Sequence, residues 1–308
     1  MSTMAFSTLQ AELASMLRLD VSDPTHATVL KRWINLADDD IHSRYDWPWA
    51  LEREIVQTVA DVTTGTVAVA AGGTTVTGTS TAFDTTLDVG KYIQFSSSND
   101  WYKVTAVAST TSLTIEAAYV GSSALSAGTY KLRKTFYSVS SSVEKVLTAR
   151  QMVSPVKLEL VHYRSLDKWR PNQTANGNPV VYVIWGYDSS NRWTFTLDPV
   201  PDAIMNIEVR FKKKRTDLSA DGDVPATPEK WKGVILDGAL ARGYEYVRKD
   251  PFDANDKRSE LALARFERGI DRMISDSEPE SDWEPQIRNP DVGLSVQNIL
   301  QLPSKYGR

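Results

Sequence analysis

The sequence predicts an α+β fold in which both ends of the chain supply helices and the middle supplies β-strands. Apolar residues recur at helical spacing near the N-terminus and again after residue 227. Between these regions lie short alternating runs of β-favouring residues, separated by turn residues. With 308 residues, of which 41% are hydrophobic and 24% are charged, the chain has material for one large domain or two moderate ones.

Residues 1–56 are predicted to form two helices of a bundle core. The first has an apolar stripe of Phe6, Leu9, Leu13, Met16 and Leu17. The second begins at Asp23-Pro24, because Asp caps a helix and Pro is preorganised for its first position. Its apolar face is expected to carry Leu30, Trp33, Ile34, Ala37, Ile41 and Tyr45, and its polar face Lys31, Arg32, Asp38, Asp39 and Arg44. It should end near Asp46, since Trp47 precedes a proline.

Residues 57–134 are predicted to form an inserted β-sandwich or barrel module. Small and β-branched residues dominate there, and charges are sparse. Alternating runs cover residues 66–69, 74–77, 91–95, 101–104 and 112–115. Gly72-Gly73 reads as a hairpin turn between two of them. The aromatic residues Phe83, Tyr92, Phe95 and Tyr119 are expected to be buried.

Residues 135–276 are predicted to complete the core with strands and two helices. The strands are expected at residues 156–160, 181–185, 192–197 and 204–211, whereas residues 142–150 fit either a short helix or an irregular stretch. Thr227 should cap the first helix, ahead of Pro228. Gly238 and Gly243 each cost about 1 kcal/mol relative to Ala inside a helix, which indicates close approach of another helix. Asp253 should cap the second helix, whose stripe is Leu263, Phe266, Ile270, Met273 and Ile274.

Residues 277–308 are predicted to form an extended arm. Pro279, Pro285 and Pro290 break regular structure, yet apolar residues continue to appear. A disordered tail would contain fewer of them, so we expect the arm to dock on a neighbouring chain. The residues expected to make that contact are Trp283, Ile287, Leu294, Val296, Ile299 and Leu300.

No catalytic, metal-binding or cofactor-binding residues are predicted. The absence of cysteine excludes disulfides and thiolate metal sites. His26, His42 and His162 lack the spacing of a metal-binding helix motif, and no glutamate stands in a pattern typical of a catalytic acid. Residues 217–222 begin like a calcium loop, but Pro228 replaces the essential glutamate, so we interpret them as a polar turn. No apolar run is long enough for a membrane helix, and no signal peptide precedes the first helix.

One strongly basic run, Lys212-Lys213-Lys214-Arg215, has two interpretations. It could make transient, non-specific contact with the phosphates of DNA in a channel. It could instead form salt bridges with an acidic neighbour such as Asp38-Asp39-Asp40, or be a solvated strand end. We favour the second interpretation, because a single run does not make a basic groove.

Several short motifs follow one another in a fixed order along the chain. Two predicted N-terminal helices end in Tyr45-Asp46-Trp47-Pro48-Trp49, and a β module follows with Val76-Thr77-Gly78-Thr79-Ser80-Thr81-Ala82-Phe83. Further motifs lie at residues 89–90, 101–104, 176–182, 197–202 and 223–225, ahead of the C-terminal helix pair. This ordered series spans nearly the whole chain and is more specific than any single motif. It resembles the head-to-tail adaptor proteins of tailed bacteriophages.

The resemblance implies a structural virion protein at the junction of portal and tail, assembled in the host cytoplasm. It implies a ring of about twelve copies, one side docked on the portal protein and the other on a tail tube or nozzle protein. The arm, residues 282–308, would reach onto the portal, and the β module would lie outside the ring, with tail fibre or spike proteins as further candidate partners. The helix faces around Trp33, Tyr45, Trp231 and Tyr244 would carry core and ring contacts.

A second hypothesis makes the chain a receptor- or carbohydrate-binding tail component that acts through the β module. Eight tryptophans could supply a sugar-binding surface, although aromatic residues also dominate protein cores and interfaces. They are Trp47, Trp49, Trp101, Trp169, Trp185, Trp193, Trp231 and Trp283. The chain lacks the long repetitive β segments of a fibre shaft, which favours the adaptor.

Overall fold

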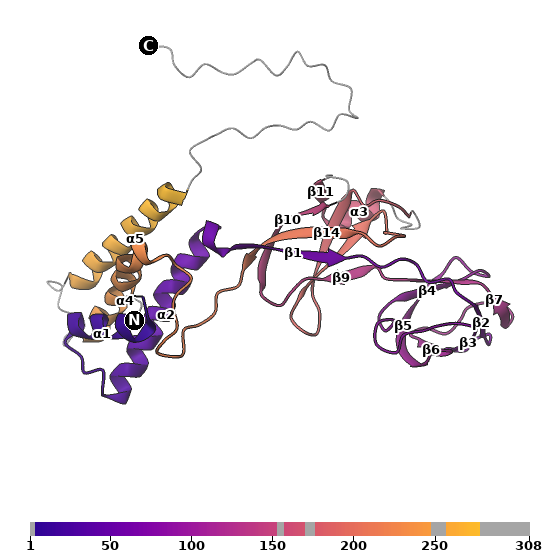
Figure 1. Cartoon of the computed structure of the whole chain (residues 1–308), viewed down its shortest axis with the longest axis horizontal. Helices are drawn as coiled ribbons and strands as arrows, with labels where there is room; N and C mark the ends of the chain where they lie inside the picture. Colours follow the sequence, from indigo (N-terminus) through magenta and orange to yellow (C-terminus); the bar gives the residue numbers. More distant parts are fainter. Residues whose placement is uncertain (1–3, 153–156, 170–175, 248–256, 278–308) are drawn as a thin grey trace, which may run out of the picture.

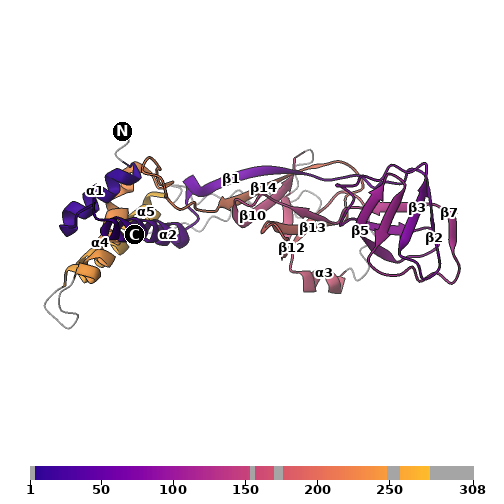
Figure 2. The same ribbon diagram turned by 90° about the horizontal axis from the view of Figure 1, so that it is seen from below.

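The computed structural model is an elongated molecule with a helical bundle at one end and two β-sheets along the rest (Figure 1). It describes residues 4–152, 157–169, 176–247 and 257–277. Seen from below in Figure 2, the order is the same: the bundle, a middle sheet and a distal sheet. Each of the three has its own cluster of buried apolar residues. The predicted α+β class is therefore confirmed, and the arm lies outside the described residues.

The bundle brings helices from both ends of the chain together. Its helices are α1 (Phe6–Leu17), α2 (Pro24–Arg44), α4 (Lys232–Val247) and α5 (Arg258–Ser277), with 3-10 turns η1 (Pro48–Ala50) and η2 (Glu229–Trp231) beside them. Asp23 caps α2 as predicted, its carboxylate accepting a hydrogen bond from the Thr25 amide at 2.7 Å. Beyond α2, the buried Trp47 indole donates to the Ile41 carbonyl at 2.6 Å and stacks on Trp49. These contacts hold the chain where the helix ends.

The middle sheet is built from strands far apart in the sequence. Its order is β1-β14-β10-β11-β12-β13-β9, and β11 and β12 are the parallel pair. The bounds are β1 (Leu51–Gln57), β9 (Phe136–Ser138), β10 (Val143–Gln151), β11 (Lys157–Leu160), β12 (Val181–Tyr187), β13 (Trp193–Asp198) and β14 (Asn206–Lys213). A short helix, α3 (Tyr163–Trp169), lies between β11 and β12 in the chain. β1 pairs with β14 without a register shift, from Leu51 opposite Lys212 to Gln57 opposite Asn206.

The distal sheet is the predicted β module, and it curls into a half-barrel. Its order is β7-β2-β3-β6-β5-β4-β8. The bounds are β2 (Thr66–Val69), β3 (Thr75–Thr79), β4 (Tyr92–Phe95), β5 (Trp101–Ser109), β6 (Ser112–Ile115), β7 (Leu125–Gly128) and β8 (Tyr130–Arg133). Phe83, Phe95 and Tyr119 are buried as expected, whereas Tyr92 is half-buried and packs on Phe136. Gly73 donates to the Ala70 carbonyl in the turn between β2 and β3, as predicted.

Several local predictions were wrong, each because tertiary contacts overrode local pattern. Residues 142–150 are neither helix nor irregular: they form most of β10, which is paired on both sides. Met16 and Leu263 were placed on buried stripes but are each 48% exposed. Thr227 does not cap a helix, because its hydroxyl donates to the Asp38 carboxylate at 3.0 Å. The predicted cap Asp253 lies outside the described residues.

The division into residues 1–56, 57–134, 135–276 and 277–308 stays a prediction. In the structure, β1 of the range 1–56 lies in the middle sheet beside β14. The strands of the range 135–276 have an apolar core separate from the core of its helices. No helix in the described ranges is long and apolar enough to cross a membrane.

Two helix glycines mark the closest approaches in the bundle, as the sequence predicts. A Cβ at Gly238 of α4 would lie 2.7 Å from the Phe266 ring of α5 and 3.0 Å from the Ala37 Cβ of α2. A Cβ at Gly243 would overlap the Leu17 side chain of α1. The missing side chains therefore let three helices pack directly against α4.

We expect Gly238→Ala to lower the free energy of unfolding by about 1–3 kcal/mol, because the methyl group forces the buried Phe266 ring to move. Gly233→Ala is the matched control, since Gly233 lies in the same helix, is exposed and has no atom within 4 Å of a Cβ. The control should stabilise by roughly 0.5–1 kcal/mol. Denaturant unfolding of both variants measures the difference, and equal effects would contradict the packing argument.

Candidate functional site: the joint between bundle and middle sheet

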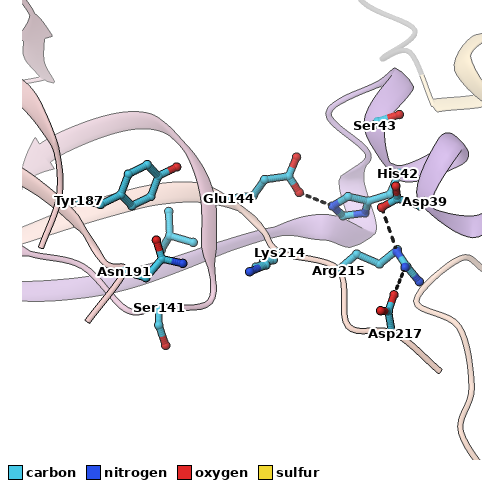
Figure 3. Close-up of a pocket in the computed structure, with 11 residues that line it drawn as sticks. Asp39, His42, Ser43, Ser141, Glu144, Tyr187, Asn191, Lys214, Arg215 and Asp217 are labelled. Atoms are coloured by element: carbon cyan, nitrogen blue, oxygen red, sulfur yellow. Dashed lines mark hydrogen bonds and ion pairs between the residues drawn. The ribbon is translucent and has the colours of Figure 1, made fainter. Parts of the chain in front are cut away.

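In the described part of the chain, two segments run between the bundle and the middle sheet. One leads from the end of α2 into β1, and the other leads from β14 back toward the bundle (Figure 1). A polar cleft of about 410 Å³ lies between α2 and the sheet at this point. Figure 3 shows its lining residues, contributed by α2, by β10 and the loop before it, by the end of β12, and by the chain that follows β14. The joint is therefore the place where the two bodies meet through side chains.

A buried lysine ties the sheet to the end of α2. Lys212, near the end of β14, is 3% exposed. Its ammonium donates to the His42 carbonyl at 2.6 Å and lies 3.3 Å from the Glu144 carboxylate. The other oxygen of Glu144 lies 2.7 Å from His42 Nε2, and the Trp193 indole donates to the Glu144 carbonyl at 2.9 Å. An ammonium removed from water needs such partners, so Lys212 specifies which groups may lie opposite it.

Arg215 makes a second cross-connection two residues past β14. Its guanidinium lies 3.2 Å from the buried Asp38 and 3.3 Å from Asp39, both on α2, and it also pairs with Asp217. Asn35, one turn before Asp39, fixes the following loop: its amide donates to the Leu218 carbonyl at 2.9 Å and accepts from the Leu218 amide at 2.8 Å. The loop after β14 is thereby held along one face of α2.

Asp38 is the most unusual group of the joint. Burial raises the pKa of its carboxyl, while the Thr227 hydroxyl and Arg215 act in the opposite direction by favouring the ionised form. Its polar-face assignment was wrong, since Asp38 is 2% exposed. Arg215 belongs to the segment after β14, and Thr227 lies just before the α4 region. Through these two contacts, Asp38 connects both segments to α2.

The basic run has a largely intramolecular role in this geometry. Lys212 and Arg215 make the contacts above, and Lys213 pairs with Glu52 of β1 at 2.9 Å. Lys214 lines the cleft. The position of Arg215 against Asp38 and Asp39 is the one that the salt-bridge interpretation expects. Contact of the run with DNA stays a prediction.

The other predicted site residues divide between core and undescribed chain. Trp33, Tyr45, Trp231 and Tyr244 all pack in or against the apolar core of the bundle. The arm residues Trp283, Ile287, Leu294, Val296, Ile299 and Leu300 lie outside the described residues. Docking of the arm therefore stays a prediction.

The histidines and the calcium-like loop serve local structure. His42 belongs to the joint, His26 lies 3.8 Å from Asp23, and His162 packs on Tyr163. In the loop after β14, the Asp223 carboxylate accepts hydrogen bonds from the backbone of Ser219 and Ala220, which makes the predicted polar turn. Among the described residues, no group of three or more potential ligands could hold a metal ion.

Sequence reasoning missed Asn35, His42 and Glu144 as members of the joint. The one available signal was a polar residue at each of these positions, and most such residues are solvated. His42 pairs with Glu144, 102 positions away, and Asn35 with Leu218, 183 positions away. No local sequence pattern contains contacts of this range.

An aromatic pocket marks the boundary between the middle and distal sheets. It measures about 190 Å³ and is lined by Tyr92, Trp101, Arg133, Thr135, Phe136, Trp185, Thr196 and Val200. Trp185 is 44% exposed, packs edge-on against Phe136 and donates its indole hydrogen to the Thr196 hydroxyl at 2.9 Å. The Arg133 guanidinium lies 4.8 Å above the Trp101 ring. The pocket thus combines open aromatic faces with a few polar groups.

The sequence matches one protein family over nearly its whole length. Residues 4–290 match the family of the SU10 adaptor protein, a match that includes all three bodies and the start of the arm. The chain belongs to the SU10 adaptor protein family. It is therefore a phage adaptor-type structural protein, a component of the virion that contacts other head or tail proteins. No curated protein matches the adaptor significantly.

The family match bears on the chemistry of the joint. Phage adaptors are structural proteins and are not a known class of enzyme. In the adaptor, the charges of the joint are matched within the chain, cation to carboxylate, and hold two bodies in a defined relative position. A structural role accounts for these contacts without a reaction.

We expect Arg215→Met to lower the free energy of unfolding of the adaptor by about 2–3 kcal/mol at neutral pH, because it leaves ionised Asp38 buried without its cation. The loss should shrink as the pH falls. The folded pKa of Asp38 already lies above its ordinary value, and removal of Arg215 raises it further, so protonation relieves the variant more than the native chain.

Denaturant unfolding between pH 7 and pH 4 measures this dependence. Asp38→Asn combined with Arg215→Met should recover part of the loss, since the buried carboxylate is removed together with its cation. Lys103→Met is the control, because the Lys103–Glu116 pair is exposed and 3.9 Å apart; it should change stability by less than about 0.5 kcal/mol. A loss that is independent of pH would contradict the role given to Asp38.

Proposed function

We propose that this protein is a head-to-tail adaptor that docks beneath the portal of a tailed phage, joins it to the tail and forms part of the DNA channel. The family match over residues 4–290 carries the proposal. Copies assemble into a ring, with twelve as the expected number, and each copy presents one face to the portal protein and another to a tail tube or nozzle protein.

The shape of the subunit supports this role. A narrow joint separates the helical bundle from the middle sheet, and the distal sheet lies at the far end of the molecule (Figure 1). An elongated subunit can contact one partner with its bundle and another with its distal sheet. Because the joint is held by buried ion pairs, displacement at one end is transmitted to the other.

The arm supplies the portal contact in this proposal. It follows directly on α5 of the bundle, so the bundle end faces the portal. Residues 278–308 contain enough apolar side chains to bury against a partner, and an extended segment that orders on binding can cover a long surface. The distal sheet then points away from the portal, toward the tail or toward fibre or spike proteins.

We expect the triple substitution Trp283→Ser, Leu294→Ser and Ile299→Ser to weaken portal binding at least about 100-fold, because each change removes an apolar side chain that this proposal places against the portal. A chain ending at Ser281 should fold and fail to bind. The matched control replaces Gln286, Gln297 and Gln301 of the same arm with serine and should bind normally. Cosedimentation with purified portal measures binding; native affinity in the triple variant would contradict the arm assignment.

Electron microscopy of the adaptor bound to portal tests the proposal as a whole. Rings of twelvefold symmetry on the portal are the expected result. Threefold rods that ignore the portal would instead support the receptor-binding alternative.

The aromatic pocket favours carbohydrate binding as a second candidate function. Exposed aromatic faces with nearby polar groups suit the apolar face and hydroxyls of a sugar. If the pocket binds a glycan, Trp185→Ala should abolish binding in a glycan array, whereas Tyr187→Ala, an exposed aromatic on the same strand, should retain it. Equal binding by both variants would eliminate this function.

A further inference from the structure

Helix α5 carries exposed charges in two separate rows. Arg265, Arg268 and Arg272 form the basic row, and Glu260, Glu267 and Asp271 form the acidic row. At 3.6 residues per turn, the rows lie roughly 110° apart around the helix axis. Both lie clear of the stripe that packs into the bundle, which is Ala262, Phe266, Ile270 and Met273.

Like charges are neighbours within each row. Arg265 and Arg268 are three residues apart, and Arg268 and Arg272 are four apart. Glu267 and Asp271 repeat the pattern on the acidic side. Opposite charges also meet along the helix, since Arg268 lies three residues before Asp271. The repulsion within each row falls when that row lies against the opposite charge.

Few oppositely charged partners for these rows lie within the subunit itself. In the described ranges, none of the three arginines makes an ion pair, although the charge of Arg265 partly offsets the upward shift that burial gives to the pKa of Asp237. Glu267 pairs with Arg44 at 2.9 Å, whereas Glu260 and Asp271 make no ion pair with any described residue. Most of both rows is thus left to a partner.

The position of α5 leaves the rows accessible. α5 packs on α4 and lies at the edge of the bundle (Figure 1). An exposed leucine accompanies each row: Leu261, 59% exposed, lies in line with the arginines, and Leu263, 48% exposed, lies on the acidic side. Each side of the helix therefore offers apolar area together with one sign of charge.

We propose that α5 is an interface between copies of the adaptor, in which the basic row of one copy lies against the acidic row of the next. Because the two rows lie on different sides of the helix, the contact can repeat head-to-tail around an axis and so close a ring. This inference deepens the proposed function, since it names the surface that forms the ring.

The charge rows set direction and register more than affinity. Exposed ion pairs are individually weak, but complementary rows disfavour wrong orientations and speed association. Self-association through α5 should accordingly weaken as salt concentration rises.

Charge reversal tests the inference on the full chain without portal. One variant carries Arg268→Glu and Arg272→Glu, and the other carries Glu260→Lys and Asp271→Lys, all at exposed positions. In sedimentation velocity at low salt, the native chain should associate and each variant alone should associate about tenfold more weakly. An equimolar mixture should recover native association, because each reversed row meets a reversed row. Circular dichroism and melting temperature verify that both variants fold.

The control is Lys103→Glu with Lys131→Glu in the distal sheet, which changes the net charge by the same amount as the arginine variant and should associate normally. A native chain that stays monomeric at every concentration, variants that associate normally, or a mixture that fails to recover would each overturn the proposal. Two further outcomes would overturn it. In one, association is lost only when the acidic residues of the arm, Glu278, Glu280, Asp282 and Glu284, become glutamine. In the other, the arginine variant loses binding to DNA but keeps self-association.

Cysteine crosslinking tests the geometry, and the chain contains no cysteine to interfere. A chain with Arg268→Cys mixed with a chain with Asp271→Cys should give a disulfide-linked heterodimer under oxidation. Equal crosslinking of the Arg268→Cys chain with itself would show that basic rows meet, and a native chain that stops at the dimer would show a twofold contact; either result would overturn the proposal. Portal is absent from these measurements, so their failure is distinct from a failure of portal binding.

Discussion

The relative position of bundle and middle sheet depends on charged groups buried where they meet. In the described chain, two segments cross between these bodies, and each body has its own apolar core. Lys212 from the sheet and Asp38 from α2 are both nearly inaccessible to water. Apolar surfaces can slide with little loss, whereas a buried ammonium or carboxylate is stable only opposite specific partners. The joint therefore specifies one arrangement of the two bodies.

This constraint suits an adaptor, which must hold two different partners at a defined spacing. The bundle, the middle sheet and the distal sheet follow one another along a single axis, so contacts at the two ends are far apart (Figure 2). The cations of the adaptor fall into two groups. Lys212 near the end of β14 and Arg215 just after it pair within the subunit. The arginines on α5 face outward, where a partner can neutralise them.

Much of the adaptor's architecture could be predicted from local pattern. Asp23-Pro24 marked the start of α2, alternation marked most strands of the distal sheet, and Gly238 and Gly243 marked close helix approaches. These features depend on a capping side chain, on residue spacing or on a missing Cβ, which are properties of a short segment. The resemblance to phage adaptors likewise rested on the order of short motifs along the chain, and the family match supports it.

Only the tertiary structure decided which polar residues matter. Helical spacing puts Asp38 on the apolar stripe of α2, four residues after Ile34, but nothing local identifies its partners. Nothing local distinguishes the strand β10 from a helix-like stretch either. The burial of Asp38 is set by residues 177 and 189 positions away, and the pairing of β10 by two other strands. A carboxylate that appears solvated in sequence can therefore lie between an arginine and a threonine. Sequence determined the elements of this protein, because their signals are local; tertiary contact determined the joint, because its charges are defined only by what lies opposite them.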